Sequence, residues 1–127
     1  MTTRALARLL LTATFHLLAG GLWAHLGATL VPGAAYVLDL LRFDATLEGA
    51  SLVLTGEGRI DDQTAHGKAV CEVARRARAS GVGCVVLAGQ DGLGPVAAAE
   101  LGIRAVVETP DPLAMESAAL ELALRSN

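Results

Sequence analysis

Short apolar runs alternate with helix-forming segments from residue 51 to the end of the chain, and this alternation constrains the fold more than any other feature. Three runs have the length and aliphatic composition of buried strands, at residues 52–55, 84–88 and 103–107. Helices are predicted after each of them, at residues 69–79, 95–101 and 112–125. Strands joined through helices in this way run parallel, with right-handed crossovers. We therefore expect an α/β fold in which helices cover both faces of a parallel sheet.

Local signals mark the beginnings of the predicted helices. Pro95 is a first-turn proline, and Asp111–Pro112 is an N-cap and first-turn pair for the last helix. Upstream of the alternating region the pattern is weaker. There, residues 36–40 are predicted as one more strand and residues 43–48 as a short helix.

The charge pattern excludes one class of partner. Glu72 lies three and four residues before Arg75 and Arg76, which supports an exposed helix face. With Arg78, these arginines form the chain's one basic run, and we interpret it as a solvated surface. Because the formal net charge is −3, nucleic acid is not an expected partner. Hydrophobic residues make up 53% of the 127 residues, enough for one compact core.

The cysteines and histidines carry no metal signature. Cys71 and Cys84 are separated too widely for the CxxC spacing of a zinc or redox site. Buried, reduced thiols in a cytoplasmic protein are therefore expected. The histidines also lack the spacing of metal ligands, and they are His16, His25 and His66. No metal site is predicted from these residues.

The segment 9–31 carries no formal charge and follows Arg4 and Arg8, so by length it could span a bilayer or imitate a secretory signal. Its glycine, histidine and threonine residues dilute the apolar run and would carry polar groups into lipid. These residues favour a helix buried in a soluble domain. A membrane is therefore not an expected partner.

Residues 56–68 form the most polar segment, with three glycines, three acids and two cations among thirteen residues. Glycine allows backbone N–H groups to approach a ligand closely. The predicted helix start at Gly67–Lys68 adds unpaired N–H groups and a positive dipole end. This combination predicts a phosphate or carboxylate ligand.

Two common nucleotide-binding patterns do not fit this segment. In the G-x-G-x-x-G dinucleotide pattern, Asp61 occupies the last glycine position and would repel a pyrophosphate. In the P-loop pattern, Asp62 replaces the first glycine and Ala69 replaces the hydroxyl residue that holds magnesium. Neither superfamily is supported.

The charged residues of the segment admit several roles. Lys68, the only lysine of the chain, is either a phosphate contact or a surface residue. Arg59 either clamps a substrate carboxylate or forms a salt bridge with Asp61 or Glu57. The acids either hold magnesium, accept a hydroxyl proton or cap the helix.

The same residues resemble a known family. The run from Leu52 to Asp61, followed by Gln63–Thr64 and His66–Gly67–Lys68, is similar to the signature of the type I glycerate kinases. The resemblance covers about residues 19–127 and includes segments on both sides of the signature. These segments are residues 33–34, 37–44, 87–89 and 102–106.

The resemblance implies ATP-dependent phosphorylation of D-glycerate to phosphoglycerate, assisted by magnesium. It implies a Rossmann-like or flavodoxin-like α/β domain that is part of a larger two-domain fold with the site in the cleft. Carried onto this sequence, it suggests catalytic roles for Asp61 and Lys68. It places the substrate- and nucleotide-binding residues at Gly56, Glu57, Gly58, Arg59, Gln63, Thr64, His66 and Gly67.

The chain also departs from the family pattern. Members of the family are much longer, and residues 1–18 match no part of them. We therefore expect a truncated form that lacks the amino-terminal half of the site and is inactive without a complementing half or a homodimer partner. One alternative is a non-catalytic α/β remnant that binds ligand or dimerises. Another is a module tethered to a membrane by residues 9–31.

Overall fold

The computed structural model describes residues 17–61 and 68–126. The chain divides into two compact units, residues 1–32 and residues 33–127, and each is described by itself. In the first unit, residues 17–26 form a helix.

The helix at residues 17–26 has several exposed apolar side chains. Leu17, Trp23 and Leu26 are exposed. His25 Nδ1 lies 3.2 Å from the carbonyl oxygen of Gly21, one turn earlier. Among the residues that the structure describes, no helix is both long and apolar enough to cross a membrane.

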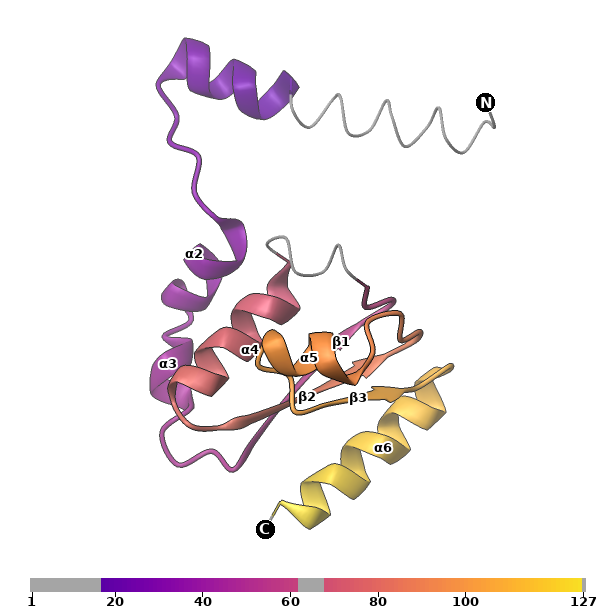
Figure 1. Ribbon diagram of the computed structural model, residues 1–127. Coiled ribbons are helices and arrows are strands. Elements are labelled where there is room, and N and C mark those ends of the chain that lie inside the picture. Colours follow the sequence, from indigo (N-terminus) through magenta and orange to yellow (C-terminus); the bar gives the residue numbers. More distant parts are fainter. Residues whose placement is uncertain (1–16, 62–67, 127) are drawn as a thin grey trace, which may run out of the picture. The chain divides into compact units, whose positions relative to one another are not determined.

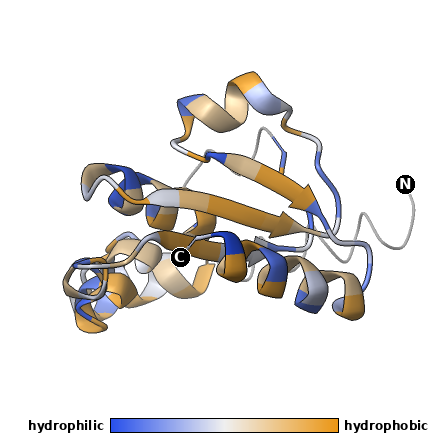
Figure 2. Ribbon diagram, turned by 90° about the horizontal axis from the view of Figure 1, so that it is seen from below, coloured by the Kyte–Doolittle hydropathy of each residue, from blue (hydrophilic) through white to orange (hydrophobic). Residues whose placement is uncertain are grey.

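A three-stranded parallel sheet forms the centre of the second unit (Figure 1). Its strands are β1 (Leu52–Glu57), β2 (Gly83–Ala88) and β3 (Ala105–Glu108), in that order, with β2 in the middle. Val53 pairs with Cys84, and Val86 pairs with Val106. The strands are largely hydrophobic (Figure 2), as expected for a parallel sheet that is covered on both faces.

Helices lie on both faces of this sheet, which confirms the predicted α/β class. The crossovers through α4 (Ala69–Ala79) and α5 (Pro95–Glu100) both progress from β1 towards β3. Right-handed crossovers in one direction place their helices on the same face. The last helix, α6 (Pro112–Arg125), lies on the opposite face (Figure 1).

The predicted strand at residues 36–40 is wrong, because this segment belongs to helix α2 (Gly33–Leu40). Short apolar runs do not distinguish a strand from a helix by periodicity alone. In the folded chain, Val37 and Leu38 line an apolar depression together with Val73 of α4, a contact that helical spacing allows. The predicted short helix downstream is confirmed as α3 (Phe43–Thr46).

The packed core lies between the sheet and α4 and α5. Its fully buried residues include Ala74, Cys84 and Val86. Burial raises the pKa of the Cys84 thiol to about 11. Cys71 is half-buried rather than buried as predicted, and the two cysteines are not joined by a disulfide.

Arg76 does not lie on a solvated face, contrary to the prediction, because its side chain is only 8% exposed. It forms ion pairs with Asp39 at 2.6 Å, Asp44 at 3.2 Å and Glu72 at 2.9 Å. It also donates to the carbonyl oxygen of Ala35 at 3.2 Å. These contacts join α2, α3 and α4, while Arg75 remains exposed.

Candidate functional site

The loops that follow the three strands meet at one edge of the sheet, the edge where parallel sheets bind ligands. The amide of Gly89 donates to the carbonyl oxygen of Glu57 at 3.2 Å, and the amide of Ile60 donates to Gln90 at 3.0 Å. The amide of Asp91 donates to a carboxylate oxygen of Glu108 at 2.8 Å. The carboxyl ends of β1, β2 and β3 are therefore linked directly.

Strand β1 extends two residues farther than predicted, through Gly56 and Glu57. Successive residues of a strand face opposite sides of the sheet. Val53 belongs to the core under α4, so Glu57 shares that face and Gly56 faces the side of α6. The strand thus divides the predicted binding segment between the two faces of the sheet.

Glu57 and Lys68 form an ion pair, with Lys68 Nζ 2.9 Å from Glu57 Oε1. The hydrogen bond to Glu57 is the main cause of the raised pKa of Lys68. Lys68 is also the N-cap residue of α4, and its side chain makes no capping hydrogen bond. The pair therefore connects the end of β1 to the beginning of α4.

The other carboxylate oxygen of Glu57 is buried and accepts no hydrogen bond among the residues that the structure describes. A buried acceptor without a donor costs free energy, so such groups are rare, and a water, an ion or a ligand can supply the donor. Glu57 Oε2 is thus an acceptor suited to a ligand hydroxyl or a metal-bound water.

Arg59 and Asp61 form a salt bridge, with Nε and Oδ2 3.3 Å apart. Arg59 also donates to Oε1 of Gln90 at 3.2 Å. Of the two alternatives for Arg59, this is the salt-bridge arrangement. Its guanidinium remains largely exposed, so it is still accessible to an anion.

The glycines of this edge differ in whether the surrounding atoms leave room for a side chain. A Cβ on Gly89 would lie 2.7 Å from the carbonyl oxygen of Gly58, so the contact between the two loops excludes a side chain at Gly89. A Cβ on Gly56 would lie 3.4 Å from the carbonyl oxygen of Leu87, an ordinary contact. A Cβ on Gly58 would meet no atom of the described residues within 4 Å.

A hollow of about 530 Å³ lies beside these glycines, towards the start of α6. We name it the glycine hollow. It is lined by the backbone of the three glycines, by Glu57 and by residues before and within α6, among them Thr109, Pro110, Asp111 and Met115. The buried Thr109 hydroxyl donates to the carbonyl oxygen of Ala88 at 3.4 Å. Residue spacing did not identify this part of the site, because α6 begins far from Gly56 in the sequence.

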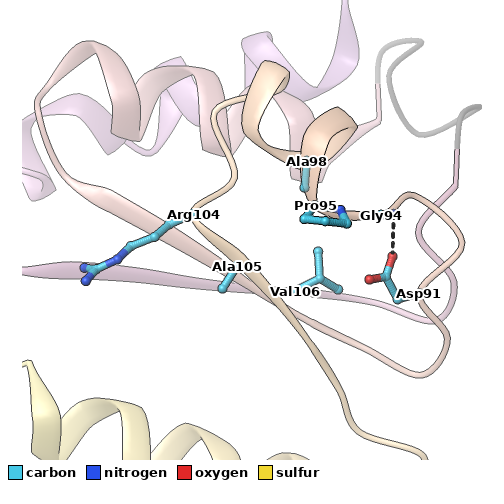
Figure 3. A pocket seen from close by; sticks show the side chains of 7 residues that line it. All are labelled: Asp91, Gly94, Pro95, Ala98, Arg104, Ala105 and Val106. Atoms are coloured by element: carbon cyan, nitrogen blue, oxygen red, sulfur yellow. Dashed lines mark hydrogen bonds between the residues drawn. The ribbon is translucent and has the colours of Figure 1, made fainter.

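A second pocket, of about 260 Å³, lies between α5 and β3 (Figure 3). Asp91 Oδ1 accepts from the amides of Leu93 at 2.9 Å and Gly94 at 3.5 Å, so it stabilises the turn before α5. The guanidinium of Arg104 points away from the other labelled residues (Figure 3). This pocket therefore offers fewer groups for chemistry than the edge around Glu57.

The structure brings together six of the predicted site residues, and the other four lie outside the described residues. Those at the described edge are Gly56, Glu57, Gly58, Arg59, Asp61 and Lys68. Those outside it are Gln63, Thr64, His66 and Gly67. The part of the chain that the structure describes contains no group of three or more histidine, cysteine or acidic residues able to hold a metal ion.

Comparison with known proteins identifies the chain's relatives. A glycerate kinase from Halalkalibacterium halodurans is 44% identical over 88 residues, which are 69% of this chain and 23% of that protein. A glycerate kinase from Bacillus cereus is 42% identical over 105 residues, 79% of this chain and 28% of the relative. A glycerate 2-kinase from Escherichia coli is 44% identical over 57 residues, 45% of this chain and 15% of the relative.

The matched segments show that the chain spans about a quarter of the length of the first two relatives. The sequence model of the glycerate kinase family matches residues 18–125, which include the sheet, its helices and the edge around Glu57. The chain therefore belongs to the glycerate kinase family.

Proposed function

We propose that residues 19–127 form one part of a glycerate kinase site, which transfers a phosphoryl group from ATP to D-glycerate. The observation that carries the proposal is the Glu57–Lys68 pair at the carboxyl end of β1, with one carboxylate oxygen bound and the other without a donor among the described residues. Residues 1–18 are proposed to take no part in this site.

Phosphoryl transfer requires a positioned hydroxyl and a cationic environment for the phosphates. In our proposal, Lys68 contributes the positive charge, and Glu57 accepts a hydrogen bond from a hydroxyl of D-glycerate. Asp61, released from Arg59, receives the hydroxyl proton, and Arg59 is then available to the substrate carboxylate. Gln63, Thr64, His66 and Gly67 are proposed to complete the binding segment.

Magnesium would enter this site with the nucleotide. Magnesium commonly keeps several waters and takes only one or two carboxylates in addition to phosphate oxygens. The Glu57 carboxylate, whose Oε2 accepts no hydrogen bond from the described residues, fits a contact to such a metal-bound water. When bound, the ion would neutralise charge on the phosphates.

We further propose that this chain binds its ligands but does not turn them over without a complementing amino-terminal half or a second copy. The chain spans 23% and 28% of two glycerate kinase relatives, so most of the length of those proteins has no counterpart here. A non-catalytic role in binding or dimerisation is the second candidate, and the same observation favours it. Both proposals place the protein in the cytoplasm.

A coupled phosphoryl-transfer assay with D-glycerate, ATP and magnesium, run beside calorimetric titrations of each ligand, tests these proposals. We expect binding without turnover by the chain alone. Lys68→Met should abolish ATP binding, whereas Arg125→Met should leave it unchanged, since Arg125 is exposed and pairs with Glu121 near the end of α6. Turnover by the chain alone would disprove the need for a partner. Absence of binding by either ligand would disprove the assignment of the site.

A further inference from the structure

At two positions of the site, the packing of the described residues does not require glycine. Gly56 and Gly58 do not adopt left-handed backbone conformations, and a Cβ at either position would make no close clash. Glycine in a strand interior weakens the strand and often marks a place where another group approaches the backbone. Both glycines line the glycine hollow.

The hollow is unsuited to an anion. Glu57 also lines the hollow, and its carboxylate is negative and already paired with Lys68 at 2.9 Å. Asp111 is negative, and its carboxylate already accepts the amide of Ala114 at 2.9 Å. Pro112 has no N–H group to donate at the start of α6. Neither phosphate nor the carboxylate of glycerate would find a cation among the described residues here, because no lysine or arginine is part of the lining that they form.

The hollow is instead suited to a flat, weakly polar group. It is an open depression of about 530 Å³, wide enough for one face of a ring to lie on. Pro110, Pro112 and Met115 supply apolar contacts, and methionine sulfur contacts aromatic rings favourably. The bare backbone at Gly56 and Gly58 leaves room for a ring to lie against the strand end.

We propose that the glycine hollow binds the nucleoside part of the phosphate donor, with a purine ring against Gly56, Gly58 and Met115. This inference rests on the proposed kinase function. Gly56 and Glu57 are consecutive residues of β1 with opposite facing directions. A nucleotide with its base in the hollow can therefore extend its phosphates around the strand end to Lys68.

The test is a titration of the full chain with adenosine, which lacks phosphates, followed by backbone amide NMR. Adenosine should bind saturably, with the largest shifts at Gly56, Gly58 and Met115. Gly58→Ala should weaken adenosine binding at least about fivefold, because a methyl group would occupy the place of the ring. Its thermal midpoint should remain that of the wild type. Gly33→Ala is the matched control, since a Cβ there also meets no described atom within 4 Å.

Several outcomes would overturn the proposal. They are no saturable adenosine binding, unchanged affinity in Gly58→Ala, shifts that cluster around Asp91 and Gly94, or a Gly58→Ala protein that does not fold. A parallel titration with inorganic tripolyphosphate separates this inference from the proposed function. Tripolyphosphate binding that is lost in Lys68→Met, without adenosine binding, would retain the kinase site and reject the hollow. Adenosine binding at the hollow without tripolyphosphate binding would support the hollow and contradict the role of Lys68.

Discussion

The two faces of the sheet are covered to different extents. On the face of α4 and α5, Val53 is 9% exposed and Val86 is fully buried. On the face of α6, the neighbouring Leu54 is 38% exposed, and α6 itself has no buried residue. Leu87 of β2 is covered there, so the open area lies over β1. Packing therefore explains why apolar residues occupy the face under α4 and α5. On the face of α6, packing does not explain the glycines or the exposed leucines.

The largest loss of stability should come from shortening a buried side chain in the packed region. Ile60 is fully buried, and its backbone is hydrogen-bonded to Gln90 and Gly92. Ile60→Ala should lower the free energy of unfolding by about 2–5 kcal/mol, because it removes buried apolar surface and leaves a cavity. Urea unfolding measures this change, and the matched change Leu124→Ala in the exposed part of α6 should remain within about 0.5 kcal/mol. Similar losses in the two variants would contradict the comparison.

The next largest effect should distinguish adjacent residues of β1. Val53→Thr should cost about 1–3 kcal/mol, because it places a hydroxyl in an apolar core. Leu54→Thr should cost less than about 1 kcal/mol, because much of that side chain already contacts water. Urea unfolding of both variants gives the difference directly. A larger loss from Leu54→Thr would show that the α6 face is covered over β1 in solution.

Local signals predicted much of this fold. The helix bounds at 69–79 and 112–125 agree with α4 and α6, because charge pairs, small apolar residues and an N-cap lie within those segments. The segment 36–40 was mispredicted because its helical packing depends on Val73 of α4, far along the chain. The burial of Arg76 could not be read from α4 alone, since Asp39, Asp44 and the carbonyl of Ala35 create it.

The site was also predictable only where local signals determine it. Six residues of the polar segment lie at the expected edge of the sheet, because β1 and the start of α4 fix their positions. The glycine hollow could not be predicted, because Pro110 and Met115 join Gly56 only after the sheet and α6 have formed. Sequence patterns locate the ends of elements, but a cavity between distant elements depends on tertiary packing.

A smaller effect should depend on pH and involve the ion pairs that Glu72 forms with Arg75 and Arg76. Hydrogen bonds from Arg75 and Arg76 lower the pKa of Glu72 from 4.5 to about 2. The pKa is depressed in the folded protein, so this contribution to stability is present above about pH 4.5 and is lost as the pH falls towards 2. Urea midpoints should therefore decrease over this range, and the decrease should be smaller in Glu72→Gln. Glu116→Gln, a change at an exposed residue of α6, should keep the wild-type slope. Equal slopes in both variants would rule out these ion pairs as the cause.

The smallest of these effects should come from the start of α6, a helix without buried residues. Asp111 accepts the amide of Ala114 at 2.9 Å, whereas the N-cap of α4, Lys68, makes no such side-chain bond. Asp111→Ala should lower the free energy of unfolding by about 1 kcal/mol, as the loss of an N-cap usually does. Calorimetric unfolding measures the loss, with Glu121→Ala as the control, because its exposed ion pair with Arg125 should contribute less than about 0.5 kcal/mol. If the cap matters and the face of α6 is as open as we describe, the loss should appear as early fraying of α6 in hydrogen exchange, while amides of α4 retain their protection. Equal loss of protection in both helices would mean that α6 is integral to the packed core, which would remove the distinction between the two faces.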